Sequence, residues 1–167
     1  MSITPVLSIF STAVVVASLA IVSAGVPRPA DAQTVGATES QFADWNVTCP
    51  SGNRCVAMHS TNGARLVAGP GGKDGGMRFA VLIAANAGRG TPVGLRTSNG
   101  TVVQLRTQRC SDGFCEAAAS PKAVPQILDN LRRADQATVA YPTNGAMVFS
   151  DVSFDGLRQA LQRAEER

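Results

Sequence analysis

The four cysteines carry the clearest chemistry in this sequence: Cys49, Cys55, Cys110 and Cys115. Their spacings are C-x5-C and C-x4-C, whereas common zinc sites and thiol redox catalysts use C-x2-C. Disulfides are therefore expected, and four cysteines allow three pairings. We favour the local pairs 49–55 and 110–115, because turn residues lie inside each. The alternative is long-range pairing, which constrains the unfolded chain more, by about 4 against about 2 kcal/mol per bridge.

No residues have the types and spacing of a catalytic site. His59 is the sole histidine, and we expect it on the surface or on an edge strand. Asp112 and Glu116 are near one another, but Asp112 precedes a glycine in a predicted turn. The glycine-rich stretch 69–76 resembles a phosphate-binding loop, yet an aspartate follows its Gly-Lys pair where such loops need serine or threonine. We predict no enzymatic activity and no metal or cofactor.

Four arginines near the C-terminus are the candidate binding surface: Arg132, Arg133, Arg158 and Arg163. They lie in predicted helices and could contact anions, or they could form the solvated face of those helices. The net charge of +3 comes from 15 basic and 12 acidic residues. This charge permits contact with lipid headgroups or sulfated glycans. The sequence lacks the dense basic stripe of a nucleic-acid-binding protein.

Short alternating segments dominate the rest of the chain and predict strands. Asn-Gly pairs at 99–100 and 144–145 are typical of hairpin turns. Apolar residues at helical spacing predict helices at 122–133 and 154–166, with Asp151, Ser153 or Asp155 as N-cap of the second. The predicted strands span residues 45–49, 55–59, 65–68, 77–84, 93–96, 102–106, 114–118, 137–141 and 146–149.

These elements predict a mainly β protein, an antiparallel β-sandwich of immunoglobulin-like or jelly-roll-like type with one or two short helices. We expect one disulfide-stapled domain at 41–167, preceded by a flexible linker at 33–40. Residues 1–32 read as a signal peptide that ends at the small-x-small triplet Ala30-Asp31-Ala32. The alternatives are cleavage after Ala24 and retention of the apolar run 6–26 as a membrane anchor.

Several motifs follow one another along the predicted domain. The chain has F-x-D-W-x-V-x-C at 42–49, a second cysteine at 55, and R-C-x-x-G-x-C at 109–115. Near the end, Val-Ser-Phe-Asp-Gly-Leu at 152–157 precedes the last predicted helix. This ordered set resembles the invasion-associated locus B family, and the resemblance covers about residues 41–165.

The resemblance implies an exported, non-enzymatic β-sandwich protein of Gram-negative bacteria. Such a protein would work in the periplasm or the outer envelope, in virulence through host-cell invasion or in envelope maintenance. Its partner would be an unknown protein, envelope component or host surface, and only an uncleaved leader would bind it to a membrane. The family has no defined catalytic residues, so the cysteines carry over as structural positions only. The alternative function is a small periplasmic inhibitor or solute-binding protein.

We expect the exported protein to begin at Gln33, because Ala30-Asp31-Ala32 fits the pattern that signal peptidase cleaves. The intact mass of the protein purified from its native host measures this directly. A species that begins before Ala24 would contradict cleavage and support the anchored alternative.

Overall fold

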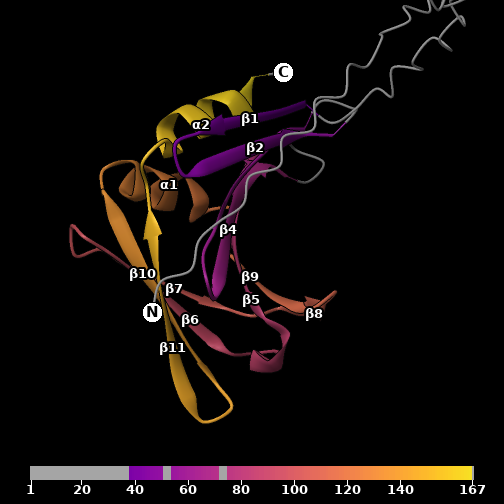
Figure 1. Ribbon diagram of the computed structural model, residues 1–167, viewed down its shortest axis with the longest axis vertical. Helices are drawn as coiled ribbons and strands as arrows, with labels where there is room; N and C mark the ends of the chain where they lie inside the picture. Colours follow the sequence, from indigo (N-terminus) through magenta and orange to yellow (C-terminus); the bar gives the residue numbers. More distant parts are fainter. Residues whose placement is uncertain (1–37, 51–53, 72–74, 167) are drawn as a thin grey trace, which may run out of the picture. The chain divides into compact units, whose positions relative to one another are not determined.

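Two antiparallel sheets make up most of the described protein (Figure 1). The computed structural model describes residues 38–50, 54–71 and 75–166, which all belong to one compact unit, Thr34–Arg167. The predicted signal peptide, 1–32, lies outside the described residues. Within them, neither helix is long and apolar enough to cross a membrane.

The large sheet has seven strands in the order β1-β2-β3-β4-β5-β9-β8. The small sheet has four strands in the order β11-β10-β6-β7. The strands of the large sheet are β1 (Thr38–Phe42), β2 (Trp45–Cys49), β3 (Val56–Ser60), β4 (Ala64–Pro70), β5 (Met77–Ala84), β8 (Arg109–Ser111) and β9 (Phe114–Ala118). Those of the small sheet are β6 (Pro92–Thr97), β7 (Val102–Arg106), β10 (Gln136–Thr143) and β11 (Ala146–Ser153).

The predicted β-sandwich with two short helices is confirmed, and every predicted strand is present. Strands β1–β5 lie side by side in chain order, which is a meander, whereas immunoglobulin-like and jelly-roll sandwiches are built from Greek keys. The sequence pattern did not predict β1 and β8, which are short and mostly exposed.

The predicted linker needs a correction. Residues 33–37 lie outside the described residues, but β1 begins at Thr38, within the range assigned to the linker. Thr38 is opposite Cys49 in the pairing of β1 with β2. The polar residues of β1 form a strand because their backbone groups hydrogen-bond to β2.

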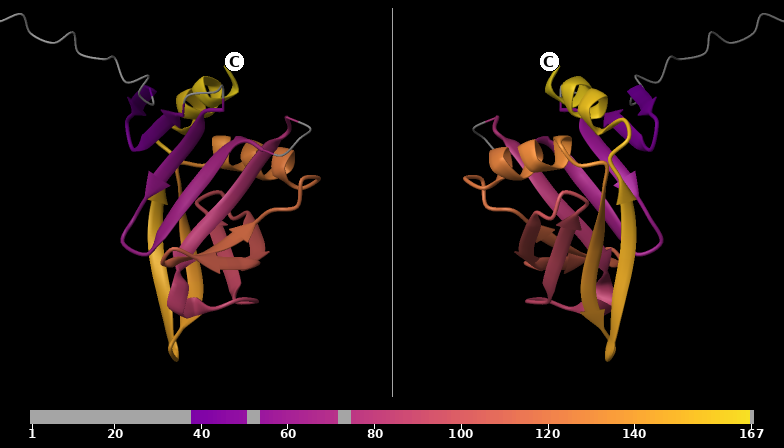
Figure 2. Two further views of the ribbon diagram at one scale, coloured as in Figure 1. Left: turned by 90° about the vertical axis from the view of Figure 1, so that its right-hand side faces the viewer. Right: turned by 90° about the vertical axis from the view of Figure 1, so that its left-hand side faces the viewer.

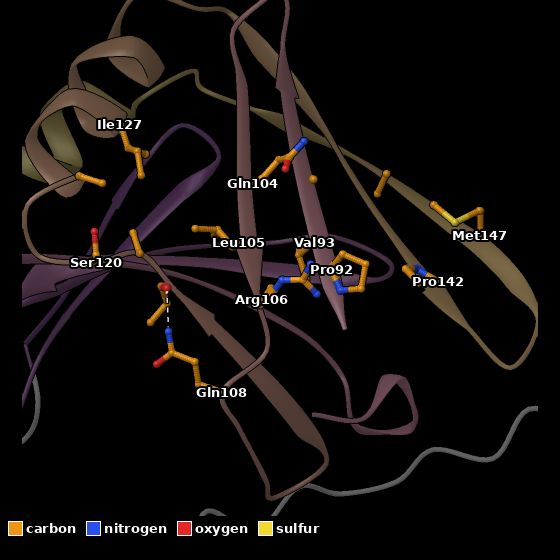
Figure 3. A pocket seen from close by; sticks show the side chains of 15 residues that line it. Pro92, Val93, Gln104, Leu105, Arg106, Gln108, Ser120, Ile127, Pro142 and Met147 are labelled. Carbon is orange, nitrogen blue, oxygen red and sulfur yellow. Dashed lines mark hydrogen bonds between the residues drawn. The ribbon is translucent and has the colours of Figure 1, made fainter. Parts of the chain in front are cut away.

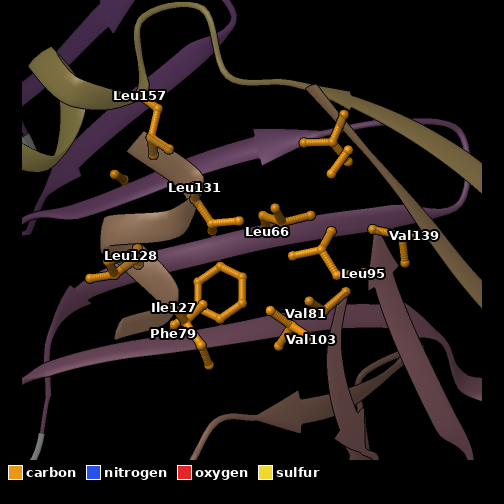
Figure 4. Close-up of a cluster of buried hydrophobic side chains, with 14 of the residues drawn as sticks. Leu66, Phe79, Val81, Leu95, Val103, Ile127, Leu128, Leu131, Val139 and Leu157 are labelled. Atoms are coloured by element: carbon orange, nitrogen blue, oxygen red, sulfur yellow. The ribbon is translucent and has the colours of Figure 1, made fainter. Parts of the chain in front are cut away.

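The core lies between the two sheets and two helices, α1 (Val124–Arg132) and α2 (Leu157–Glu165). Helix α1 contacts β5, and α2 contacts β1, β2, β3 and β4. Both helices lie towards one end of the sandwich, and the β10–β11 hairpin projects at the other (Figures 1 and 2). Figure 4 shows side chains of the large sheet, the small sheet and the helices meeting in one cluster. Its fully buried members include Leu66, Phe79, Val81, Leu95, Leu131, Val139 and Leu157.

The two helices begin in different ways. Pro125 lies in the first turn of α1, where its missing N–H costs nothing. The predicted N-caps of α2 are wrong, because Gly156 is the N-cap, with φ of 82°, and no side chain caps the helix. The Ser153 hydroxyl instead accepts a hydrogen bond from Asp155 N at 3.1 Å. A Cβ on Gly156 would lie 1.9 Å from Phe42 O, so the backbone of β1 requires glycine here.

Gly156→Ala tests this close approach, and Gly100→Ala is its matched control. Gly100 has a similar φ of 86° but open space around it, so its replacement should cost only the left-handed backbone penalty of about 1 kcal/mol. We expect Gly156→Ala to lower the free energy of unfolding by about 3 kcal/mol, because steric overlap adds to that penalty. Urea denaturation measures the free energy of unfolding of both variants. Equal losses would mean that the contact with Phe42 adds no cost of its own.

Candidate functional site

Residues 102–111 form one segment that passes from the small sheet to the large sheet. Its first part, β7, pairs with β6, and its last part, β8, pairs with β9. The change of sheet occurs at two residues: Thr107 N donates to Thr91 O at 3.0 Å, and Gln108 N donates to Glu116 O at 2.8 Å. Segments that switch sheets in this way form the corners of sandwiches.

Two buried threonines fix this corner. Thr107 is 4% exposed and Thr91 is 9% exposed. The Thr107 hydroxyl accepts a hydrogen bond from Thr91 N at 2.8 Å and donates one to Gly88 O at 2.7 Å. Buried hydroxyls with both roles satisfied hold a backbone in place, so the direction in which β7 leaves the corner is fixed.

A groove of about 800 Å³ opens where β7 and the end of β9 separate (Figure 3). It continues over the edge of β7 to strands β6, β10 and β11 of the small sheet. Ser120 and the start of α1 form the opposite wall (Figure 3). Apolar parts of its lining include Pro92, Leu105, Ala119, Ile127 and Met147. The polar side chains of the lining are Gln104, Arg106, Gln108 and Ser120.

Backbone groups of β7 add hydrogen-bonding capacity to the groove. Thr97 N donates to Thr101 O at 2.9 Å, and bonding alternates along an antiparallel pair. In the register Val93↔Leu105 and Gly94↔Gln104, the odd-numbered residues of β7 therefore bond to β6. Gln104 and Arg106 direct their N–H and C=O groups away from β6, towards the side where Figure 3 places Ser120.

The groove has the chemistry of a binding site. Arg106 is the one ionisable side chain among the described residues that line it, and its guanidinium donates to Gly90 O at 3.2 Å. The Gln108 amide donates to Ala118 O at 3.1 Å. No carboxylate, imidazole or thiol belongs to the described lining, so these side chains offer a ligand hydrogen bonds and one cation, and none of them is a usual general base for the Ser120 hydroxyl.

The four arginines predicted as an anion-contact surface are mostly engaged with other groups. Arg132 pairs with Glu165 at 3.2 Å, and Arg163 pairs with Glu166 at 3.0 Å. Arg133 pairs with Asp129 of α1 at 2.5 Å. Arg158 donates to Arg132 O at 3.5 Å. Arg132 and Arg158 line one shallow pocket together, and the anion-contact role of the four side chains stays a prediction.

The other candidates from the sequence, His59, Asp112 and Glu116, take part in local structure. His59 is half-buried on β3, between β2 and β4 rather than on an edge strand, and its ring stacks on Trp45 at 5.5 Å. Asp112 has φ of 51° in the β8–β9 turn, as the turn prediction requires. Glu116 pairs with Arg109 at 2.7 Å and with Arg78 at 3.2 Å. Among the described residues, no cluster of three or more possible ligands could hold a metal.

The cysteines form the predicted local disulfides, Cys49–Cys55 and Cys110–Cys115. Cys110 and Cys115 are directly opposite one another in the β8–β9 pairing. The second bridge therefore closes the short hairpin that ends the sheet-switching segment. Neither bridge joins the two sheets, so both staple strands that are already neighbours.

The groove could not be predicted from the sequence, because its lining comes from strands and a helix that only the folded chain brings together. Comparison with known proteins identifies no relative: no family model, curated protein or solved structure matches this chain. The resemblance to the invasion-associated locus B family therefore rests on the sequence motifs.

Replacing both Cys110 and Cys115 by serine should lower the free energy of unfolding by about 2 kcal/mol, the loop-closure value for so short a loop. Serine is chosen because it is close to cysteine in size and polar, and Ala85 O, which lies 3.4 Å from the Cys115 Sγ, can accept a hydrogen bond from its hydroxyl. Urea denaturation measures the loss. A loss above about 4 kcal/mol would show that the bridge holds more than its own hairpin.

Proposed function

We propose that this chain is an exported, non-enzymatic envelope protein of the invasion-associated locus B type that binds a partner through the groove beside β7. The observation that carries the proposal is the groove itself, which combines apolar walls, an unpaired strand edge and one arginine. These are the features by which proteins recognise an extended segment of another protein. The proposed biological role is host-cell invasion or envelope maintenance.

The two disulfides indicate an oxidising, extracytoplasmic compartment. The finer location, periplasm or outer envelope, belongs to the proposal. It is supported by the predicted signal peptide at 1–32 and by the family resemblance.

The motifs that carry the resemblance contact one another in the folded domain. Trp45, from the first motif, is fully buried, and its indole N–H donates to Ser153 O, in the last motif, at 3.1 Å. Gly156, also in the last motif, lies against Phe42 of the first. The motif residues that make these contacts stabilise the fold. They therefore support a fold shared with the invasion-associated locus B family, and they say nothing about which surface binds a partner.

A small periplasmic solute-binding protein is the second candidate. The volume of about 800 Å³ is within the usual range of small-molecule sites, and this single observation favours it. Proteins that bind solutes and proteins that bind peptides differ in ligand size, so one binding experiment can separate them.

The test measures binding of the protein purified from periplasm to two surfaces, isolated Gram-negative envelopes and intact host cells. We expect saturable binding to at least one of them, and Ser120→Trp should weaken it about tenfold, since an indole at this exposed position would lie over the groove. Ser111→Trp is the matched control, because Ser111 is equally classed as exposed but lies on β8, away from the groove lining. Its binding should be unchanged.

Two outcomes would overturn the proposal. Absence of binding to both surfaces would remove the interaction role. Equal effects of the two tryptophan variants would show that binding uses another surface. A rise in the melting temperature with the low-molecular-weight fraction of the periplasm, abolished by Ser120→Trp alone, would favour the solute-binding candidate.

A further inference from the structure

The outer edge of β11 is an unpaired strand edge at the end of the small sheet. β11 pairs only with β10 in the part of the chain that the structure describes. The two strands are joined by the turn Asn144-Gly145, both with positive φ, and Thr143 and Ala146 flank it as partners. Partners that flank a two-residue turn exchange hydrogen bonds. Even-numbered residues of β11 therefore bond to β10, and Met147, Phe149 and Asp151 direct their backbone groups outwards.

The structure limits this free edge at both ends. One end is the hairpin turn. At the other end, Ser153 O, the next outward carbonyl, accepts the hydrogen bond from the Trp45 indole at 3.1 Å. The free edge thus consists of the backbone groups of three residues, with Phe149 in the middle.

Apart from Asp151, the edge lacks the residue types that usually prevent pairing. Strand β11 contains no proline, lysine or arginine, which are the common protections of edge strands. Its outward side chains include Phe149, 68% exposed, and Met147, 53% exposed. Unprotected apolar edges of this kind pair with another strand.

We propose that this edge pairs with β11 of a second copy of the chain, antiparallel and centred on Phe149. In this register Phe149 is opposite Phe149 of the other copy, and Met147 is opposite Asp151. Every outward backbone group of the free edge then has a partner, because the edge is symmetric about its central residue. Any other antiparallel register leaves at least one of the three residues unpaired.

The charges of β11 do not oppose pairing with a second copy. The chain carries a net charge of +3, so two copies repel one another unless they meet where arginines are absent. Asp151 is the one charged residue of β11, and the centred register places it opposite Met147. Its carboxylate accepts a hydrogen bond from Thr138 at 2.8 Å within its own copy. No like charges of the two strands therefore face each other.

The pairing would join the two small sheets into one continuous sheet. Phe149 and Met147 of both copies would lie on the same outer face, since side chains at alternate positions share a face. Aromatic side chains on directly opposite residues are favourable cross-strand partners. The surface is distinct from the groove lining except at Met147.

The first experiment is sedimentation velocity over a concentration series, with two lysine variants. We expect wild-type protein to pass from monomer to dimer, and Phe149→Lys to weaken dimerisation at least tenfold. Val102→Lys is the matched control, because Val102 is 56% exposed on β7, the opposite edge of the same sheet. Its dimerisation should equal that of wild type. Thermal melting checks that both variants are folded.

A second experiment tests which residues of the two β11 strands are opposite one another. Phe149→Cys should crosslink two copies through a short bismaleimide. Met147→Cys should not, because its two copies would be about 14 Å apart along the strands. A protein that stays monomeric at every concentration would overturn the proposal. So would a dimer that Val102→Lys disrupts and Phe149→Lys does not, or one that crosslinks through 147 and not through 149.

Discussion

The contact between the first strands and the last helix is the constraint on which the fold depends. The buried Trp45 of β2 donates its indole N–H to Ser153 O at the end of β11, and Gly156 brings the start of α2 against Phe42 O. This contact joins the two sheets directly and fixes the position of α2, which packs on β1, β2, β3 and β4. An unpaired indole N–H would be costly in this core, so the hydrogen bond to Ser153 O holds the end of β11 beside β2.

The second organising feature is the segment that changes sheets at Thr107. A sandwich normally closes its sheets over each other, and here β7 and β9 separate beyond the corner, leaving the groove between them. The buried threonines and the Cys110–Cys115 bridge hold the two sides of the corner. The groove is thus a consequence of rigid local structure, and its shape should differ little with and without a ligand.

The sequence predicted the local structure and the β-sandwich class, but it did not predict the contacts between residues far apart in the chain. Alternation, Asn-Gly turns and short cysteine spacings report interactions between near neighbours, so the strands, hairpins and local disulfides could be predicted. Strand β1 was missed because its stability comes from pairing with β2, which its polar residues do not reveal. The N-cap Gly156 and the groove depend on contacts between residues far apart in the chain. The anion-contact role of the four arginines stays a prediction, and the pair Arg132–Glu165 could not be predicted because it depends on the placement of α1 beside α2.

The link between Trp45 and Ser153 has a consequence for the order of folding during synthesis. The two residues are 108 positions apart, and a chain is synthesised from its N-terminus. The meander β1–β5 can form early, but the indole has no partner until almost the whole domain has emerged. Native packing of the first strands is therefore delayed until the C-terminal strand and helix have been made, so the domain folds late in synthesis.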